Sequence, residues 1–201
     1  MVWELYCRAP RAGLHIATMS ESGRILTTRL SIEPFTEHFL TQQYVNWLND
    51  PDVVRYSTQR HRRHTLESCR KYLDSFLGTP HYFWAIVEHV EGFGHIGNMN
   101  AYIDPADQVA DLGILVGNKN AWRHGYSREA WLAVCSHLFE AIGIRKITAG
   151  TCASNAGMLA LMKSTGMIGD GRRVRQTVVE GQEVDIVHAA LFKGAWNPRL
   201  A

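Results

Sequence analysis

A buried strand, a short polar loop and the start of a helix are predicted by residues 111–130, DLGILVGNKNAWRHGYSREA. The apolar run at 114–116 forms the strand, and apolar residues recur at helical spacing over 131–142. The loop Trp122–Ser127 therefore lies just before a helix N-terminus. Backbone N–H groups in a first helical turn have no intrahelical partner, and the helix dipole favours an anion there.

Three residues of this loop suit a phosphate or pyrophosphate group. Arg123 and His124 supply positive charge or hydrogen-bond donors, and Gly125 lets a ligand approach the backbone closely. The alternative is an ordinary strand–loop–helix connection with an exposed Arg-His pair, because strand–Gly–helix patterns are common in α/β chains.

The composition indicates one globular domain. The chain has 201 residues, of which 46% are hydrophobic and 20% are charged, and this is enough apolar mass for a core. We expect an extension over 1–23 that adds an edge strand or stays loose, a domain over 24–194 and a tail over 195–201. The net charge of +2 is too small to indicate a nucleic-acid partner.

The sequence predicts neither a membrane span nor a bound metal. No apolar run approaches the roughly 18 residues of a spanning helix. Glu4 and Arg8 interrupt the first apolar residues, so we expect a cytoplasmic protein without a signal peptide. The four cysteines lack CxxC spacing and are interpreted as reduced thiols, and the ten histidines lack the usual metal-ligand spacings.

The chain reads in order as strand, two helices, three antiparallel strands, helix, strand, helix and hairpin. The two early helices are expected to start at the caps Thr36 and Thr65. The residues of the second helix that are expected to face inward are Leu66, Cys69, Leu73, Phe76 and Leu77. The strands and later helices are expected at 25–32, 82–87, 95–103, 109–116, 127–142, 145–151, 154–167, 174–179 and 184–191. A strand–helix–strand crossover should make 109–116 and 145–151 parallel neighbours.

The densest positive patch of the chain lies between the two early helices. It covers residues 55–64, RYSTQRHRRH. A charge run of this kind is most often a solvated loop. Its functional interpretation is a clamp for an anionic substrate such as a nucleotide diphosphate, because arginine matches phosphate bidentately.

This element order and the central loop resemble the GNAT acyltransferase family, whose members bind acetyl-CoA. The family's phosphate loop, Gln/Arg-x-x-Gly-x-Gly/Ala, stands here as Trp122–Ser127, with Trp first and Ser last. Gly125-Tyr126 followed by Glu129-Ala130 agrees with the branch that acetylates ribosomal-protein N-termini. The resemblance implies an α/β (α+β) fold: a mixed, mostly antiparallel sheet of about seven strands with about four helices, and a parallel strand pair splayed around acetyl-CoA.

A second similarity narrows the acceptor. The segment from Tyr44 to Tyr56, YVNWLNDPDVVRY, is similar to the Trp-Leu-Asn-Asp-Pro-x-Val segment of GNAT proteins in bacterial surface-sugar biosynthesis. That similarity implies acetylation of a nucleotide-linked amino sugar. A protein N-terminus or a small amine is the alternative acceptor, and a non-catalytic acyl-CoA-binding module is the alternative outside enzymes. Oligomeric state is not indicated by the sequence.

The resemblance also implies site residues. Those expected to hold acetyl-CoA are Leu115, Val116, Arg123, His124, Gly125, Tyr126, Ser127, Asn155 and Lys163. Those expected to hold the acceptor are Tyr56, Arg60, His61 and Arg63. Asp111 is the candidate base, with His95 and His188 as rivals.

The family's general-acid positions are apolar in this chain. The position four residues before Gly166-Met167 holds Met162 instead of Tyr, and the position three residues after Asn155 holds Met158 instead of Ser. A thiol with a pKa of about 8.5 can leave as a thiolate at modest cost, so no general acid is predicted.

Overall fold

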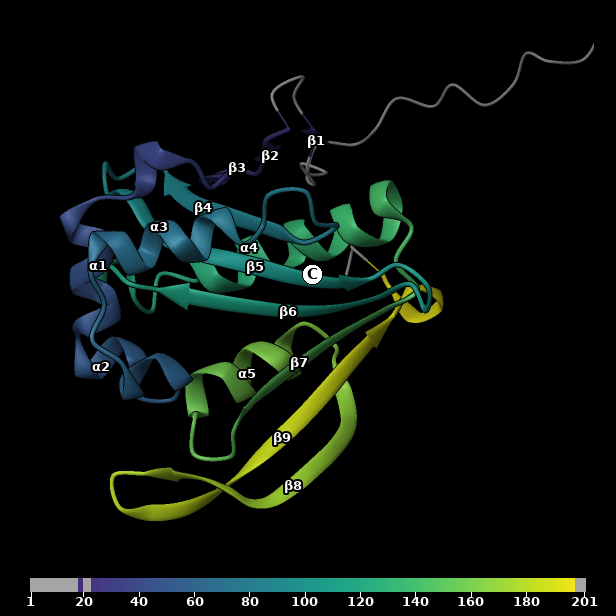
Figure 1. Cartoon of the computed structure of the whole chain (residues 1–201). Helices are drawn as coiled ribbons and strands as arrows, with labels where there is room; N and C mark the ends of the chain where they lie inside the picture. Colours follow the sequence, from purple (N-terminus) through teal and green to yellow (C-terminus); the bar gives the residue numbers. More distant parts are fainter. Residues whose placement is uncertain (1–17, 20–22, 198–201) are drawn as a thin grey trace, which may run out of the picture.

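A computed structural model describes residues 18–19 and 23–197, and the described strands form one mixed sheet (Figure 1). The strand order is β1-β2-β3-β4-β5-β6-β7-β9-β8, and only the β6/β7 pair is parallel. The strands are β1 (Thr18–Met19), β2 (Ile25–Leu26), β3 (Leu30–Pro34), β4 (Tyr82–Glu88), β5 (Gly94–Asp104), β6 (Val109–Val116), β7 (Lys146–Cys152), β8 (Ile168–Val179) and β9 (Gln182–Phe192). The predicted α/β fold with one parallel pair is confirmed, with nine strands instead of about seven.

Five helices flank the sheet. They are α1 (Gln42–Asn49), α2 (Pro51–Val54), α3 (Leu66–Asp74), α4 (Tyr126–His137) and α5 (Ala156–Ser164). Side chains of α4 and α5 pack with strand residues such as Met99 and Ile147 in the larger core. Side chains of α1 and α3 pack on the opposite face, against Phe83 and Ala85 of β4. Helices α1–α3 therefore cover the β3–β5 side of that face.

Two predicted details of the N-terminal half are wrong. The strand expected over 25–32 is split by a turn, in which Thr27 binds Leu30 through its backbone N–H and its side-chain oxygen. Helix α1 is capped by Thr41, which accepts from the N–H of Tyr44, because residues 37–39 form a separate 3-10 turn after Thr36. The strand and helix patterns of the sequence continue across both turns, so they gave no indication that the chain turns there.

Helix α3 confirms its predicted cap and three of the five residues predicted to face inward. Thr65 and Ser68 form a reciprocal capping box, which pairs backbone N–H groups that the start of a helix leaves without an intrahelical partner. Leu66 in the first turn is 46% exposed, and Leu77 is 74% exposed because the helix has already ended at Asp74. The other three predicted residues do face inward: Cys69 is 2% exposed, and Leu73 and Phe76 pack on the same core.

The parallel strands β6 and β7 separate soon after they meet. They pair only at Val109↔Lys146, Ala110↔Ile147 and Asp111↔Thr148. Beyond that point β6 stays paired with β5, whereas β7 stays paired with β9 and leans away with the β8–β9 hairpin (Figure 1). The sheet is therefore split open beside the C-terminal half of β6.

The chain ends fall partly outside the described residues. Of the predicted extension over 1–23, the structure describes only 18–19 and 23, and β1 pairs with β2 at Thr18↔Leu26. Of the predicted tail, Trp196 packs on Phe139 with ring centroids 5.5 Å apart. No helix among the described residues has the length and apolar character that a membrane span requires.

Glu88 is a buried carboxylate that holds the β4–β5 turn. It is 2% exposed and accepts from the backbone N–H groups of Val90, Glu91 and Phe93 at 2.5, 2.7 and 3.0 Å. Burial acts to raise the pKa of Glu88, but these three hydrogen bonds outweigh burial and hold the pKa below its usual range.

We expect Glu88→Gln to lower the free energy of unfolding at pH 7 by about 1–3 kcal/mol, because charge-assisted hydrogen bonds are lost. A depressed pKa in the folded state stabilises the fold above the unfolded pKa, and this contribution is lost as pH falls through the folded pKa. Urea unfolding at pH 7 and at progressively lower pH should show the variant's deficit shrinking in acid. A constant deficit, or an equal deficit in the exposed control Glu91→Gln, contradicts the prediction.

Candidate active site

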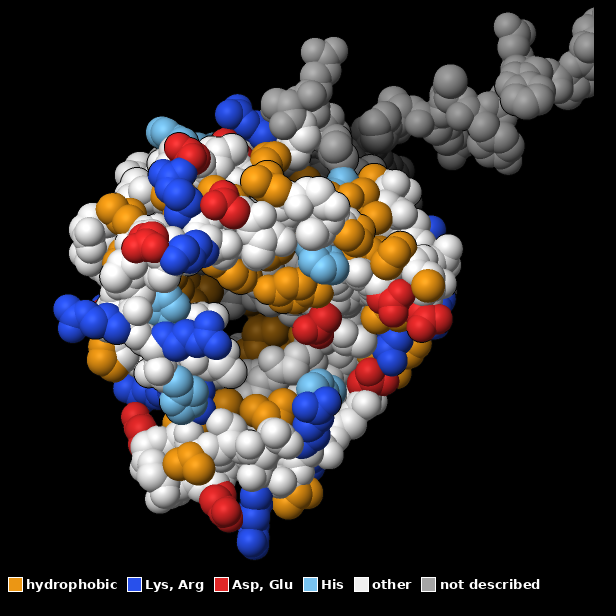
Figure 2. Space-filling model, in the orientation of Figure 1, with side chains coloured by type: hydrophobic (Ala, Val, Ile, Leu, Met, Phe, Trp, Pro, Cys, Tyr) orange, Lys and Arg blue, Asp and Glu red, His pale blue; other side chains and the backbone are white. Residues whose placement is uncertain are grey.

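A cleft of about 890 Å³ lies where β6 and β7 part, and Figure 2 shows it as a hollow with basic side chains gathered along one side. Its wall on the sheet is the β6 segment 112–116 together with Gly150 and Thr151 of β7. Helix α5 adds Asn155 and Met158. The opposite wall comes from the segment between α2 and α3, and the central sheet residues Asn98 and Asn100 of β5 complete the lining.

The β6 wall presents unpaired backbone groups to the cleft. The N–H of Gly117 donates to Ile96 of β5 at 2.9 Å, so the alternation along a strand points the N–H groups of 113 and 115 toward β5 as well. The N–H groups of Leu112, Ile114 and Val116 then point toward β7, which has already diverged. Of the two predicted donors, Val116 faces the gap and Leu115 does not, and Ile114 is a donor that the sequence reasoning missed.

The predicted phosphate loop lies at one end of this wall. Gly125, at φ +82°, is the N-cap of α4, and Arg123 also has a positive φ of 67°. No hydrogen bond within the described residues takes up the backbone N–H groups of 123–127. Trp122, Arg123 and Ser127 line the cleft, and Trp122 Nε1 donates to the Val116 carbonyl at 2.8 Å. The loop thus offers backbone donors and one guanidinium to an anion.

An ion pair far away in the sequence holds this loop in place. Arg29, in the turn before β3, donates from Nε to Glu129 of α4 at 2.7 Å and from Nη1 to the His124 carbonyl at 3.0 Å. Glu129 also accepts from the Arg29 backbone N–H at 2.9 Å and from the Thr27 hydroxyl at 2.7 Å. The guanidinium carbon lies 4.6 Å from the centroid of the Tyr126 ring. Nothing in the local pattern indicates this pairing, because the partners are about a hundred residues apart.

The side chains of His124 and Tyr126 face away from the cleft. Tyr126 is 1% exposed, and its ring stacks on the His124 ring at 5.6 Å. His124 Nδ1 lies 3.4 Å from a carboxylate oxygen of Glu91. Within the cleft, these two residues can therefore serve a ligand only through their backbone.

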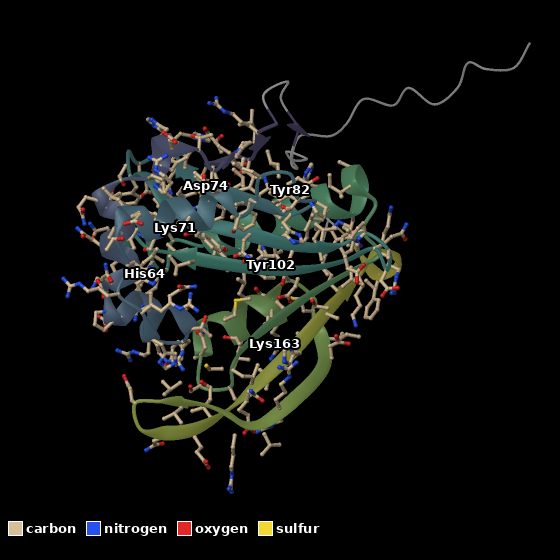
Figure 3. All side chains as sticks on the ribbon, in the orientation of Figure 1. His64, Lys71, Asp74, Tyr82, Tyr102 and Lys163 are labelled. Atoms are coloured by element: carbon tan, nitrogen blue, oxygen red, sulfur yellow. The ribbon has the colours of Figure 1, made fainter. Side chains whose placement is uncertain are left out.

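Asn155 lies in the cleft wall, but Lys163 does not. Asn155 caps α5 by accepting from the Met158 N–H at 3.2 Å, and its amide nitrogen donates to Thr151 at 3.0 Å. Lys163 is exposed on α5 and does not line the cleft (Figure 3).

The three predicted base candidates lie in different surroundings. Asp111 is exposed and accepts from the Thr148 hydroxyl at 2.8 Å. It shares a face of β6 with Gly113 and Leu115, one step beyond the cleft lining. His188 does not line the cleft, but its Nδ1 lies 3.0 Å from where a Cβ on the cleft residue Gly150 would be. Its Nε2 is buried without a partner among the described residues.

His95 is enclosed by rings and lies outside the cleft. The rings of Phe35, Phe39 and Trp47 surround it, and its Nε2 lies 3.0 Å from the Gly97 carbonyl. Burial lowers the pKa of His95 to about 4, so the ring is neutral near pH 7. It is not placed to take a proton from a group in the cleft.

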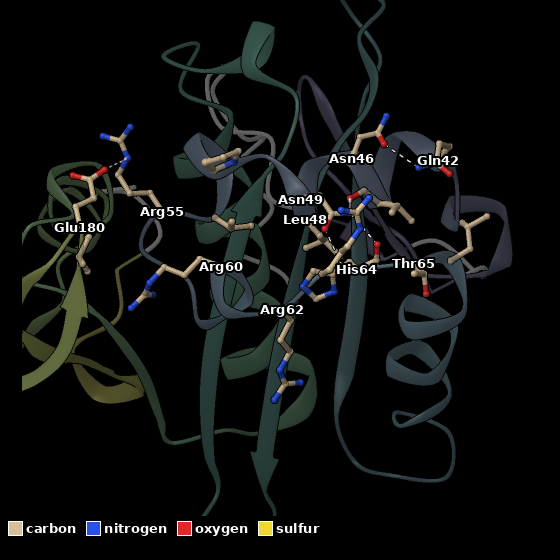
Figure 4. Close-up of a pocket in the computed structure, with 16 residues that line it drawn as sticks. Gln42, Asn46, Leu48, Asn49, Arg55, Arg60, Arg62, His64, Thr65 and Glu180 are labelled. Carbon is tan, nitrogen blue, oxygen red and sulfur yellow. Dashed lines mark hydrogen bonds and ion pairs between the residues drawn. The ribbon is translucent and has the colours of Figure 1, made fainter.

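Basic side chains line the wall between α2 and α3. Arg62, Arg63 and His64 line both this cleft and an adjoining pocket of about 850 Å³ that reaches Glu180 at the tip of the β8–β9 hairpin (Figure 4). Tyr56 lines the cleft as well. Arg62 and His64 belong to the predicted positive patch, but they were not among the residues predicted to bind the acceptor.

Two predicted acceptor residues lie elsewhere. Arg60 borders only the adjoining pocket, and its guanidinium donates to the Ser57 carbonyl at 2.7 Å and to the Thr177 hydroxyl of β8 at 2.8 Å. Its hydrogen bonds therefore tie the 55–64 segment to the hairpin. His61 lines neither pocket.

Comparison with known proteins gives a family and a fold. A family model described as an acetyltransferase (GNAT) domain matches residues 29–168. An acetyltransferase (GNAT family) from Bacillus anthracis has 19% identity and a TM-score of 0.72, over 85% of this chain and 99% of that chain. The comparison with curated proteins gave no match.

Two further solved structures contain coenzyme A. The spermidine N-acetyltransferase from Vibrio cholerae, solved with CoA and spermine, has 13% identity and a TM-score of 0.74, over 84% of this chain and 98% of that chain. The ribosomal-protein alpha-N-acetyltransferase RimL, solved with CoA, has 14% identity and a TM-score of 0.72, over 89% and 98%. At these identities the likeness shows the fold.

Glu129→Gln should weaken CoA binding about five- to thirtyfold, corresponding to about 1–2 kcal/mol of charge-assisted hydrogen bonding that positions the loop. Isothermal titration of CoA into the purified variant measures the effect. The matched control is Glu140→Gln, an exposed carboxylate in the turn that follows α4. Unchanged CoA affinity in Glu129→Gln would show that the Arg29–Glu129 pair does not position the loop.

Proposed function

This chain belongs to the GNAT acetyltransferase family, and we propose that it acetylates the amine of an anionic acceptor, a nucleotide-linked amino sugar of bacterial surface-polysaccharide biosynthesis. The observation that carries the proposal is the basic wall of the cleft, with Arg62, Arg63 and His64 facing the space where an acceptor must enter. Arginine matches phosphate oxygens bidentately, so a diphosphate is the group that this wall fits best.

The acyl-donor end of the cleft fits acetyl-CoA. The unpaired N–H groups of 123–127 with Arg123 and Ser127 suit a pyrophosphate, and Asn155 suits the pantetheine arm. When bound, acetyl-CoA supplies the acetyl group as a thioester. The N–H groups of Ile114 and Val116 point into the gap where its carbonyl would lie, and preorganised backbone donors stabilise negative charge that develops on such an oxygen.

The charge of the opposite wall argues against a polyamine acceptor. Asp52 is the one carboxylate among the described residues that line the cleft, and it is already engaged by Arg55 at 3.0 Å and by Lys119 at 3.4 Å. A polycation would meet the Arg62 and Arg63 charges without a free carboxylate to compensate them, and like-charge approach opposes binding.

The acceptor amine must lose its proton before attack, and we assign this step to Asp111 acting through water. Asp111 lies two residues before Gly113 on the same face of β6, and the Thr148 hydroxyl donates to one of its carboxylate oxygens. The general-acid positions hold Met158, which lines the cleft, and Met162, which is buried. The leaving thiol therefore departs as a thiolate or takes its proton from solvent.

Arg62→Ala and Arg63→Ala should each raise the KM for a nucleotide amino sugar about five- to thirtyfold. This factor corresponds to the loss of about 1–2 kcal/mol from one charge-assisted contact. The effect should be larger at low ionic strength, because salt screens exposed charges. Thiol release from acetyl-CoA over an amine panel measures it, with Arg173→Ala on the exposed face of β8 as the control. Turnover only with peptides or with polyamines would overturn the proposed acceptor.

Asp111→Asn should lower kcat about a hundredfold, a typical contribution of general base catalysis, and leave CoA affinity unchanged. Steady-state kinetics with a saturating acceptor and a CoA titration measure the two quantities. Asp74→Asn, at the end of α3, is the matched control. A variant with an unchanged kcat would exclude Asp111 as the base.

A further inference from the structure

We propose that Asn98 and Asn100 form a neutral recognition site for the acceptor, in which two primary amides hydrogen-bond the hydroxyl groups next to the reacting amine. This inference rests on the proposed function for the identity of the acceptor as a sugar. The site itself is defined by the side chains of β5 and β6 alone.

Asn98 is a buried polar side chain with an unused hydrogen-bonding group. It is 8% exposed and lines the cleft, and its Oδ1 is buried without a hydrogen-bond partner among the described residues. Leaving such a group unpaired costs about 1–3 kcal/mol, and most buried polar groups in folded proteins are paired. A ligand that donates a hydrogen bond to Asn98 Oδ1 would therefore explain why this amide is held unpaired at the wall of a cleft.

Asn100 presents a second amide beside the first. It lies two residues along β5, so both side chains are on the same face of the sheet, and both line the cleft. A Cβ at Gly113 would lie 2.8 Å from Asn100 Oδ1. The glycine on β6 therefore makes the room in which the Asn100 amide lies.

The two amides lie next to the reaction site. Asn98 pairs in register with Leu115, and Asn100 pairs with Gly113. They are thus one strand away, about 4.8 Å, from the β6 edge whose N–H groups face the acetyl group. A group bound there is attached close to the acceptor amine, whereas the basic wall holds a more distant part of the same molecule.

The chemistry of the amides selects uncharged polar groups. Each amide offers two donors and one carbonyl acceptor and has no charge. A hydroxyl group can both donate to the amide carbonyl and accept from the amide N–H groups. The N–H groups of a protonated aliphatic polyamine can only donate to the carbonyl. An apolar group next to the reacting amine can do neither. A site built to hydrogen-bond a hydroxyl discriminates strongly against an analogue without it, because the buried amide is then left unpaired.

The test is the variant Asn98→Leu, which keeps the side-chain size and removes the amide. We expect kcat/KM for a nucleotide amino sugar to fall at least about tenfold, with CoA affinity unchanged and the melting temperature unchanged or higher, because an unpaired buried group is removed. The preference for the amino sugar over a nucleotide with a simple aminoalkyl chain should also disappear. Asn98→Asp should lower turnover of the anionic acceptor and raise turnover of spermine relative to it.

The outcomes separate this inference from the proposed function. If the enzyme acetylates other amines but no amino sugar, the proposed acceptor fails, and Asn98→Leu is then measured on the best acceptor found. Unchanged kcat/KM and unchanged selectivity on that acceptor would overturn the inference. A lower melting temperature accompanied by weaker CoA binding would also overturn it, since Asn98 would then have a structural role.

Discussion

The separation of β6 from β7 after three paired positions is the constraint on which the rest of the structure depends. A central strand normally has its hydrogen-bonding groups paired on both sides, and unpaired buried groups are costly. Here β6 keeps one partner and leaves the N–H groups of Leu112, Ile114 and Val116 facing the gap on the other side. The N–H groups that face the gap, the cleft beside them and the separate direction of the β8–β9 hairpin all follow from this one opening.

Contacts between distant segments keep the opening in shape. The Arg29–Glu129 pair holds the loop 122–127 at one end, and Trp47 packs so closely on Gly117 that a Cβ at this position would clash with its ring. At the other rim, Arg55 lies 3.6 Å from Glu180 of the hairpin. The rims of the cleft are therefore fixed by side-chain contacts, since β6 and β7 have no backbone pairing there.

Local patterns in the sequence were sufficient for most of the elements and for their one parallel pair. The apolar run between two turn segments placed β6 at 109–116 without error, and the glycine before a helical stripe placed the loop that precedes α4. Side-chain direction could not be obtained in this way. Whether His95 faces rings or a cleft, and whether Leu115 or Ile114 donates into the gap, depends on the face and register that packing imposes. The Arg29–Glu129 pair needs tertiary contact across about a hundred residues, for which one sequence has no signal.

The cleft combines charged and neutral recognition for a physical reason. The basic wall with Arg62 and Arg63 is partly open to solvent, where charges attract an anion over a distance but discriminate poorly between anions. Asn98 is almost fully buried, so its hydrogen bonds form in a low-dielectric environment and an incorrect partner is penalised by an unpaired amide. In the proposed site, the charged wall at the entrance thus attracts the acceptor, and the amides beside the reacting amine select which acceptor is used. This division predicts that changes to the wall act mainly on KM and salt dependence, and that changes to the amides act on which acceptor is used.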